Sequence, residues 1–185
     1  GSGKSTLLKL FNATASPSAG VVRYRGQDIE SWDTLKLRRE VSLISQNAFL
    51  FDTDIRENFR RFYESREQNP PDDMRIQEFL RLCMLDMPLD KDCATLSGGE
   101  RQRVYTALFL SFGPRVVLLD EPTAALDTAN GRALIDNLMG YCRERGTDCV
   151  IVSHDHDLAE RYADAVITLK SRQSAQGREA DASSG

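Results

Sequence analysis

Two short runs of residues contain groups that could bind a phosphate and activate water. The first run is LSGGERQR, residues 96–103. Ser97 followed by Glu100 three residues later predicts a capping box at the start of a helix. Gly98 and Gly99 leave backbone N–H groups uncovered, so an anion can approach the positive end of that helix. The first run therefore predicts a phosphate-binding turn.

The second run is VVLLDEP, residues 116–122. Four aliphatic residues followed by Asp120 and Glu121 predict a buried parallel strand with two carboxylates at its C-terminal tip. Open α/β sheets bind their ligands at this edge. The second run therefore predicts a place where charged groups could act on a phosphate.

Other segments must position these groups. The chain has 185 residues, which is one domain by length. β-Branched and aromatic runs predict strands, and apolar residues at helical spacing with start and stop signals predict helices. The predicted strands are 20–26, 41–45, 115–120, 149–153 and 165–169. The predicted helices are 6–11, 35–40, 54–65, one capped by Asp72 or Asp73, one from the 97–100 turn to 112, 128–145 and 155–162.

Composition narrows the possible functions. The net charge of −4 gives no electrostatic footprint for nucleic acid, so no nucleic-acid partner is expected. No run is apolar and long enough to cross a bilayer, so a membrane role would need a partner. The four cysteines show no C-x-x-C spacing and are expected to be reduced packing residues: Cys83, Cys93, Cys142 and Cys149.

At their spacing, the two runs resemble the signature and Walker B motifs of ABC-type ATPases, and further motifs follow in family order. Gly1-Ser2-Gly3-Lys4-Ser5-Thr6 looks like the end of a Walker A loop, and Gln46 ends a strand-like run as the Q-loop glutamine does. Ala125-Leu126-Asp127 resembles the D-loop, and His154 resembles the switch histidine. The resemblance covers about residues 1–170.

The resemblance implies an α/β fold of the P-loop NTPase (RecA-like) type, with a mainly parallel sheet and an inserted α-helical subdomain at about 47–113. The ABC ATPase domain is expected over 1–170, followed by a disordered tail at 171–185. The Walker A pattern lacks its first glycine and the strand before it. The chain is therefore expected to be truncated at its N-terminus, with the first strands missing.

The resemblance also implies ATP and Mg²⁺ as cofactors. Expected catalytic residues are Glu121, which polarises the water, His154, and Gln46. Expected metal residues are Ser5, Gln46 and Asp120. Expected nucleotide-binding residues are Gly1, Ser2, Gly3, Lys4, Ser5, Thr6, Ser97, Gly98, Gly99, Glu100 and Asp127. Taken alone, His154 would be an ordinary histidine at a strand end.

Family resemblance implies a two-fold, head-to-tail homodimer and a separate membrane permease, with the chain on the cytoplasmic face of a bacterial inner membrane. The permease is expected to dock in a groove near Phe49–Ile55, although Phe49, Leu50 and Phe51 could equally pack inward. One alternative is a soluble, non-transport ABC ATPase, against which the short insert argues. Another is a truncated fragment that is inactive on its own. Among transporters, 41–51 and 116–169 are similar to a bacterial subgroup described as iron exporters.

Overall fold

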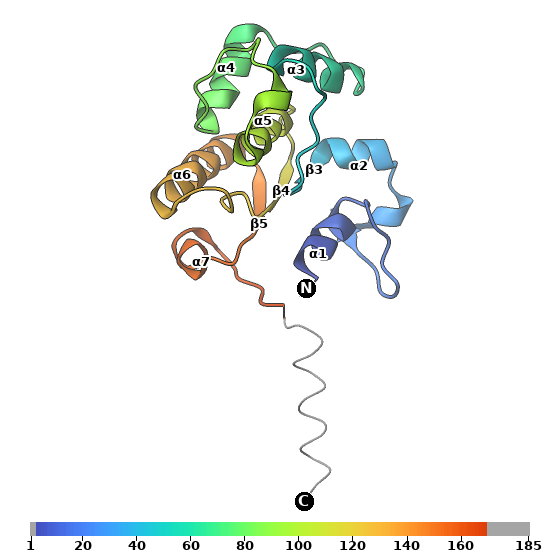
Figure 1. Cartoon of the computed structure of the whole chain (residues 1–185). Coiled ribbons are helices and arrows are strands. Elements are labelled where there is room, and N and C mark those ends of the chain that lie inside the picture. Colours follow the sequence, from blue (N-terminus) through green and yellow to red (C-terminus); the bar gives the residue numbers. More distant parts are fainter. Residues whose placement is uncertain (1–2, 170–185) are drawn as a thin grey trace, which may run out of the picture.

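The structure is a computed structural model that describes residues 3–169. Its centre is a three-stranded parallel sheet in the order β3-β4-β5 (Figure 1). The strands are β3 (Val41–Ile44), β4 (Val116–Asp120) and β5 (Asp148–Val152). Ile44 pairs with Leu119, and Asp120 pairs with Val152. The C-terminal ends of the three strands therefore lie at one edge of the sheet.

Alternation along β4 divides the core into two layers. Val117 and Leu119 belong to the core shared with the central helices, whereas Leu118 belongs to a smaller core that contains Leu8 and Leu37. Successive side chains of a strand point to opposite faces, so one buried strand serves both layers. The sheet is consequently covered on both sides.

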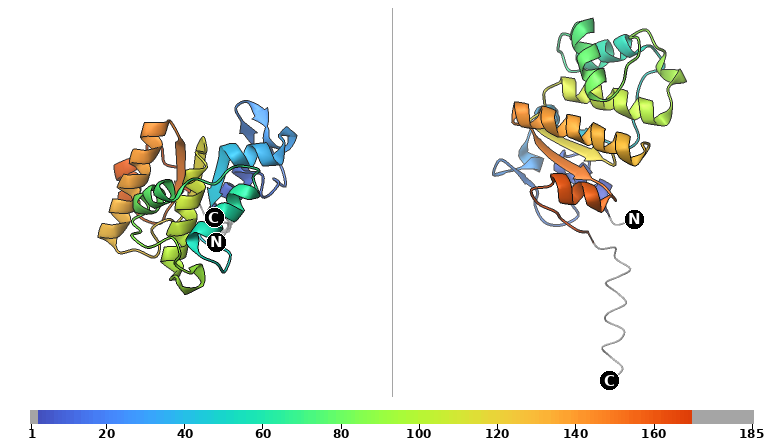
Figure 2. Two further views of the ribbon diagram at one scale, coloured as in Figure 1. Left: turned by 90° about the horizontal axis from the view of Figure 1, so that it is seen from above. Right: turned by 90° about the vertical axis from the view of Figure 1, so that its left-hand side faces the viewer.

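The helices that cover the sheet fall into these two layers (Figure 2). On one side are α1 (Lys4–Phe11), the 3₁₀ turn η1 (Ile29–Ser31) and α2 (Thr34–Glu40). On the other are α3 (Ile55–Glu64), α4 (Asp73–Leu82), the 3₁₀ turn η2 (Cys93–Thr95), α5 (Gly98–Ser111), α6 (Thr128–Arg145) and α7 (His156–Tyr162).

Most of these helices begin at a side chain that accepts a hydrogen bond from the first turn. Such caps satisfy backbone N–H groups that have no partner inside the helix. The capping residues are Asp33, Asp54, Asp72, Ser97, Asp127 and Asp155. The predicted helices are confirmed with bounds within a few residues, and α6 ends at Gly146 in the left-handed conformation that glycine favours.

The helices α3, α4 and α5 enclose the larger core. Ile55, Phe59 and Leu80 are fully buried there. The Tyr63 hydroxyl donates to the Ser111 carbonyl at 2.9 Å, which ties the end of α3 to the end of α5. This layer holds the first turn of α5, which the sequence predicts to bind phosphate, against the rest of the core.

Two strand predictions differ from the structure. In the 20–26 segment, only β1 (Arg23–Tyr24) is a strand, and it pairs in antiparallel fashion with β2 (Gln27–Asp28). The strand predicted at 165–169 is wrong: Val166 and Ile167 are 63% and 80% exposed, and no strand of the described chain runs beside them. β-Branched residues favour a strand only where a neighbouring ladder accepts their backbone groups.

The sequence also led to expectations about the two ends of the chain, the cysteines and membrane-spanning helices. Gly1, Ser2 and the tail at 171–185 lie outside the described residues. The cysteines are free thiols, with Cys83, Cys93 and Cys142 buried, as expected of packing residues. Among residues 3–169, no helix combines the length and the apolar character that crossing a bilayer requires.

Candidate active site

Three groups expected to be functional converge at the C-terminal edge of the sheet. Asp120 ends β4, Glu121 follows it, and His154 lies two residues beyond β5. The parallel register, in which Asp120 pairs with Val152, brings the two strand ends together. Asp120 is buried, whereas a quarter of the Glu121 side chain is exposed.

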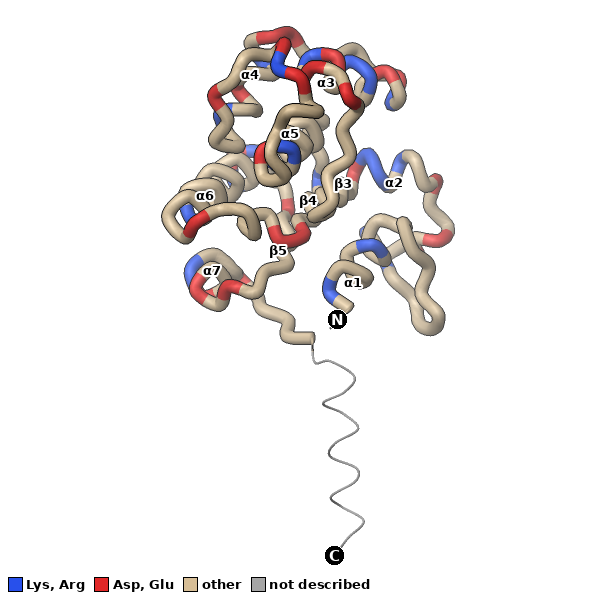
Figure 3. The backbone as a smooth tube through the Cα atoms, in the orientation of Figure 1, with Lys and Arg blue, Asp and Glu red and all other residues tan. Residues whose placement is uncertain are grey.

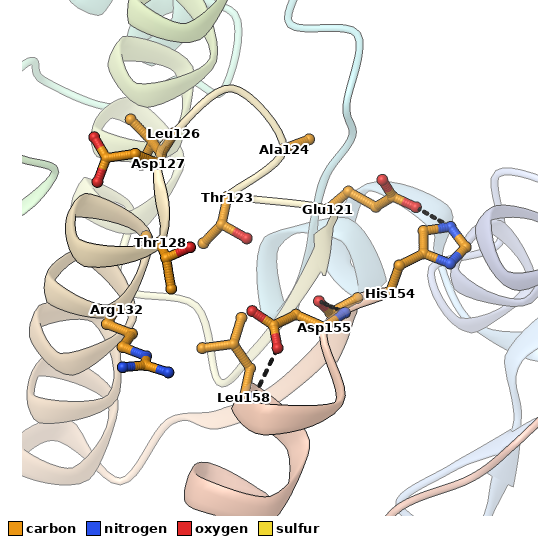
Figure 4. A pocket seen from close by; sticks show the side chains of 12 residues that line it. Glu121, Thr123, Ala124, Leu126, Asp127, Thr128, Arg132, His154, Asp155 and Leu158 are labelled. Atoms are coloured by element: carbon orange, nitrogen blue, oxygen red, sulfur yellow. Dashed lines mark hydrogen bonds and ion pairs between the residues drawn. The ribbon is translucent and has the colours of Figure 1, made fainter.

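The Glu121 and His154 side chains contact each other directly, with His154 Nε2 2.7 Å from Glu121 Oε1 (Figure 4). Glu121 has a φ of 51°, in the left-handed region that non-glycine residues rarely adopt. Three hydrogen bonds hold this backbone: the Glu121 N–H donates to Val152 O at 2.9 Å, and Glu121 O accepts from the Ala124 N–H at 3.2 Å and from Gln102 Nε2 at 3.4 Å. Residues held in sparsely populated backbone regions cluster at functional sites.

A hollow of about 220 Å³ lies beside this pair, between the end of β4, the start of α6 and the start of α7. Figure 4 shows Glu121 and His154 on one side of it, and Asp127, which precedes α6, and Arg132, on α6, on another. The lining residues are Glu121, Thr123, Ala124, Leu126, Asp127, Thr128, Gly131, Arg132, Ser153, His154, Asp155 and Leu158.

Asp127 borders the hollow but is held by its own helix. Its carboxylate accepts from the Asn130 N–H at 3.0 Å and from Asn130 Nδ2 at 2.5 Å. These hydrogen bonds from Asn130 keep the pKa of Asp127 below its usual range. The residue therefore stays ionised at the start of α6 and fixes the loop that leads into it.

The first turn of α1 lies at the same edge of the sheet. Figure 1 and Figure 2 both place the N-terminal end of α1 near the C-terminal ends of β4 and β5. This turn carries Lys4, Ser5 and Thr6, and its N-cap is Gly3 with a φ of 84°. A glycine at this position keeps the N–H groups of the turn free of a covering side chain, which suits an anion.

The turn at 97–99 lies elsewhere and does not line this hollow. The predicted capping box is confirmed: the Glu100 carboxylate accepts from Ser97 N and from Ser97 Oγ, each at 2.8 Å. A Cβ added to Gly99 would stand 2.9 Å from the Ala125 Cβ. The turn therefore packs closely against the loop that leads to Asp127.

Gln46 lies in an exposed bend just after β3, at the carboxyl edge of the sheet. The described structure thus brings together Glu121 and His154 in one contact, and Asp127 in the same hollow. Lys4, Ser5 and Gln46 lie at the same edge of the sheet, but they do not line the hollow.

Sequence reasoning missed Gln102 as a positioning residue. Gln102 is buried, and its amide links the signature helix α5 to the backbone of Glu121. It lies inside the LSGGERQR run, five residues after the Ser97 cap. Helical spacing alone does not reveal that its amide reaches the strand end.

The parallel sheet, the carboxylates at its tip and the glycine-capped first turn of α1 define an ATPase of the P-loop class. A family model described as "ABC transporter" matches residues 1–124. The chain therefore belongs to the ABC transporter family, and it is an ATP-binding, ATP-hydrolysing domain of that family.

Individual relatives agree with this family. The chain is 35% identical over 170 residues to the "Probable iron export ATP-binding protein FetA" of Escherichia coli, covering 92% of this chain and 75% of that protein. It is 38% identical to "Protein STAR1" of Oryza sativa, covering 91% of this chain and about half (49%) of that protein. The likeness to FetA agrees with the subgroup that the sequence resembles.

Solved structures share the fold. The structure of cbiO1 from Clostridium perfringens, described as part of the ABC transporter complex cbiONQ, matches with a TM-score of 0.72 and 29% identity, covering 88% of this chain and 67% of that one. A dimeric structure of the ATP-binding cassette MJ0796, bound to ADP and Pi, matches with a TM-score of 0.72 and 26% identity, covering 85% and 72%. The expected P-loop NTPase fold is confirmed.

Proposed function

We propose that this chain hydrolyses ATP at sites shared between two copies and passes the resulting movement to a separate membrane permease. The single observation that carries the permease role is the exposed ring of Phe49, three residues after Gln46. The catalytic role rests on the Glu121–His154 contact at the sheet edge.

Each residue has a role that suits its position. Lys4 supplies a positive charge for the β and γ phosphates, beside the N–H groups of the α1 turn. Glu121 polarises the attacking water, and His154, within hydrogen-bond reach of Glu121, holds that water and the γ-phosphate. Gln46 senses the occupied site from the bend after β3. These are the groups that phosphoryl transfer requires.

The residues also fit a magnesium ion. Mg²⁺ prefers oxygen ligands, and Asp120 and Ser5 bring a carboxylate and a hydroxyl to one edge of the sheet. We infer that Asp120, Ser5 and Gln46 hold the ion and its water shell. When bound, the ion would neutralise charge on the phosphates.

The position of the 97–99 turn supports a dimer. Ser97, Gly98 and Gly99 lie apart from the hollow that contains Glu121 and His154. In a head-to-tail pair, this turn would face the phosphates held by Lys4 and Ser5 of the partner copy, and Asp127 would lie at the contact. MJ0796, which shares the fold, is dimeric in its ADP-bound structure.

The docking surface for the permease differs from the groove expected between Phe49 and Ile55. Ile55 and Leu50 are 0% and 3% exposed, so they belong to the core. The surface beside them offers the exposed ring of Phe49 and four partly buried rings next to it, which we together call the aromatic strip, namely Phe49, Phe51, Phe62, Tyr105 and Phe109. Neighbouring rings in the strip are 4.4 to 6.5 Å apart.

Phe49 can therefore be tested without disturbing the core. Phe49→Asp should abolish co-purification of the full-length protein with its permease, because a carboxylate replaces an apolar contact worth about 1.5–3 kcal/mol. Met74→Asp is the matched control, since Met74 is 69% exposed on α4 and is not one of the rings of the strip. Unchanged complex formation by Phe49→Asp would contradict the permease role.

The same Phe49→Asp variant distinguishes a transporter subunit from a non-transport ABC ATPase. We propose that the protein binds the cytoplasmic face of a membrane only through the permease. The wild type should then sediment with membranes, and Phe49→Asp should not. A protein that hydrolyses ATP but never sediments with membranes would instead be a non-transport ABC ATPase.

A further inference from the structure

We propose that Cys142 and Cys149 form a reversible disulfide when the protein meets a hydroperoxide, so that the two thiols are a redox modification site. The site lies in a part of the molecule that neither ATP hydrolysis nor permease docking uses. It depends on where α6 and β5 place the two sulfur atoms, and on the contact between them.

The chain reverses direction between the two cysteines. Cys142 lies in the last turn of α6, and Gly146, with a φ of 62°, ends that helix. The Thr147 N–H donates to Cys142 O at 2.9 Å, and β5 begins at the next residue. The turn therefore returns the chain to Cys142 just before Cys149, although six residues separate the two cysteines in the sequence.

The register of the sheet directs Cys149 toward Cys142. Cys149 pairs with Val117 on β4, and Val117 belongs to the larger core. Paired residues on neighbouring strands point to the same face of a sheet. Cys142 belongs to that core as well, and Cys149 packs against it. The two side chains meet there, and the Cys149 thiol donates a hydrogen bond to the Cys142 sulfur.

This hydrogen bond makes the two thiols chemically different. It lowers the pKa of Cys142, because it stabilises the thiolate. The same bond, together with burial, raises the pKa of Cys149, whose proton it holds in place. The thiolate is the form of cysteine that acts as a nucleophile. Cys142 is therefore the group that attacks the oxidant, and Cys149 is the thiol that completes the disulfide.

The other two cysteines lack this arrangement. Cys83 and Cys93 are fully buried, and burial raises the pKa of each thiol. The Cys93 sulfur accepts a hydrogen bond from Asn58 Nδ2 at 3.4 Å. Within residues 3–169, neither of these thiols has a hydrogen bond with another sulfur. Both should stay reduced, so they are an internal control.

Access to the pair favours a small oxidant. Cys142 is 3% exposed, whereas the turn that joins it to β5 is open to solvent. Arg145, Gly146 and Thr147 in this turn line a hollow of about 360 Å³. Hydrogen peroxide is little larger than water. Glutathione disulfide is far larger and would reach a sulfur this buried only if the turn opened.

The pair is separate from the candidate active site. Cys149 is the second residue of β5, and Val152, which pairs with Asp120, is three residues further along, or about 10 Å. Figure 3 shows acidic residues, in red, at the carboxyl edge of the sheet, whereas the two cysteines lie toward its other edge. Oxidation of the pair therefore leaves the groups that act on ATP chemically unchanged.

The oxidation balances with hydrogen peroxide as the only reactant. The Cys142 thiolate attacks one peroxide oxygen, so that an S–O bond forms and the O–O bond breaks. The hydroxide that leaves takes up the proton that Cys142 released and becomes water. The Cys149 sulfur then attacks the Cys142 sulfur: the S–S bond forms, the S–O bond breaks, and a second water leaves with the Cys149 proton. The two sulfur atoms lose two electrons, which the peroxide gains.

The test asks which thiols of the reduced full-length protein hydrogen peroxide removes. Catalase ends the reaction, and N-ethylmaleimide in guanidinium chloride then labels every thiol that remains. Trypsin cuts after Arg143 and Arg145, so Cys142 and Cys149 fall in separate peptides. Mass spectrometry should find these two peptides joined, with the label lost at these two cysteines and kept at Cys83 and Cys93. Dithiothreitol should restore both lost labels.

Variants separate the two roles. Cys149→Ser should form no cross-link, and dimedone should trap Cys142 as a sulfenic acid. Cys142→Ser should leave Cys149 reduced and labelled. Cys93→Ser is the matched control, should cross-link as the wild type does, and circular dichroism checks that each variant is folded. The wild-type result alone decides the proposal if a variant does not fold.

Three results would overturn the proposal. One is full labelling of all four thiols at a peroxide excess that oxidises a free cysteine peptide. Another is a disulfide that includes Cys83 or Cys93. The third is a glutathione adduct on Cys149 that forms with glutathione disulfide more readily than the cross-link forms with peroxide.

Discussion

Two helix starts expected to bind the same kind of ligand are built in opposite ways. The helix α1 begins at Gly3, which has no side chain, and its first turn carries Lys4. The helix α5 begins at Ser97, whose hydroxyl and N–H both bond to Glu100. Among residues 3–169, no side chain caps the first start, whereas the second start is closed by a carboxylate of its own chain.

We infer from this difference that one phosphate can be bound from two sides, by the α1 turn and by the α5 turn. We expect the N–H groups of the α1 turn and the charge of Lys4 to bind phosphate before a second copy approaches. The α5 turn must exchange the bond from Ser97 to Glu100 for a bond to the ligand. It is therefore suited to a late contact, made when a second copy approaches.

The largest effect on ATP hydrolysis is expected at Glu121, which we propose activates the water at the phosphate bound by the two helix starts. Glu121→Gln should lower turnover by about 10²- to 10⁴-fold, because an amide cannot accept the proton of the attacking water. ATP binding should persist, since the α1 turn is unchanged. Single-turnover hydrolysis and nucleotide binding measure the two effects separately.

Glu144→Gln, an exposed glutamate on α6, is the matched control and should hydrolyse ATP normally. Near-normal turnover by Glu121→Gln would show that another group activates the water.

A smaller effect, on stability, is expected where the 97–99 turn packs on the loop that follows β4. Gly99→Ala would place a Cβ 2.9 Å from the Ala125 Cβ, so the loop must shift. Overpacking of this kind costs about 1–3 kcal/mol of unfolding free energy. Gly98→Ala is the control for thermal unfolding, because its added Cβ meets nothing within 4 Å. Equal melting temperatures would contradict the close packing.

Removing the cap should cost less. Ser97→Ala should lower the unfolding free energy by about 1 kcal/mol, the usual value of a helix cap. Asp72→Ala removes a comparable cap from α4 and should cost about the same. Only Ser97→Ala should also slow ATP hydrolysis. If both variants slowed it equally, the effect would come from stability and not from phosphate contact.

The smallest expected effect is a pH dependence of amide hydrogen exchange, which should differ between the first turns of α1 and α5. Hydrogen bonds from Ser97 lower the pKa of Glu100. Their stabilising contribution is therefore complete above the ordinary carboxyl pKa, near 4.5, and is lost as the pH falls through the lowered value. Amide exchange between pH 5 and pH 3 should rise at residues 98–101 beyond its intrinsic change. It should not do so at residues 5–7, where no carboxylate caps the turn.

Much of this architecture could be predicted from the sequence because it depends on local signals. The capping box of Ser97 and Glu100, the buried run of β4 and the glycine that ends α6 each act within a few residues. The sequence could predict only that Glu121 and His154 lie near each other. Their direct contact depends on the order of the strands in the sheet, which the sequence does not show.

The errors share one physical cause, which is dependence on distant neighbours. The run at 165–169 has strand composition but no described strand beside it to complete a ladder. Ile55 has helical spacing that fits a groove or a core equally well, and its place in the larger core buries it completely. Gln102 could not be recognised because its partner is a backbone carbonyl nineteen residues away.

In the proposed dimer, Lys4 of one copy and Ser97 of the other act on the same ATP. This shared site is tested by mixing two full-length variants that should each be inactive, Lys4→Ala and Ser97→Arg. In a head-to-tail mixed dimer, one of the two sites contains both wild-type residues. At equal concentrations, about half of the dimers are mixed, so about a quarter of the wild-type ATPase rate should return. No regained activity in a mixture shown to contain mixed dimers would contradict the shared site.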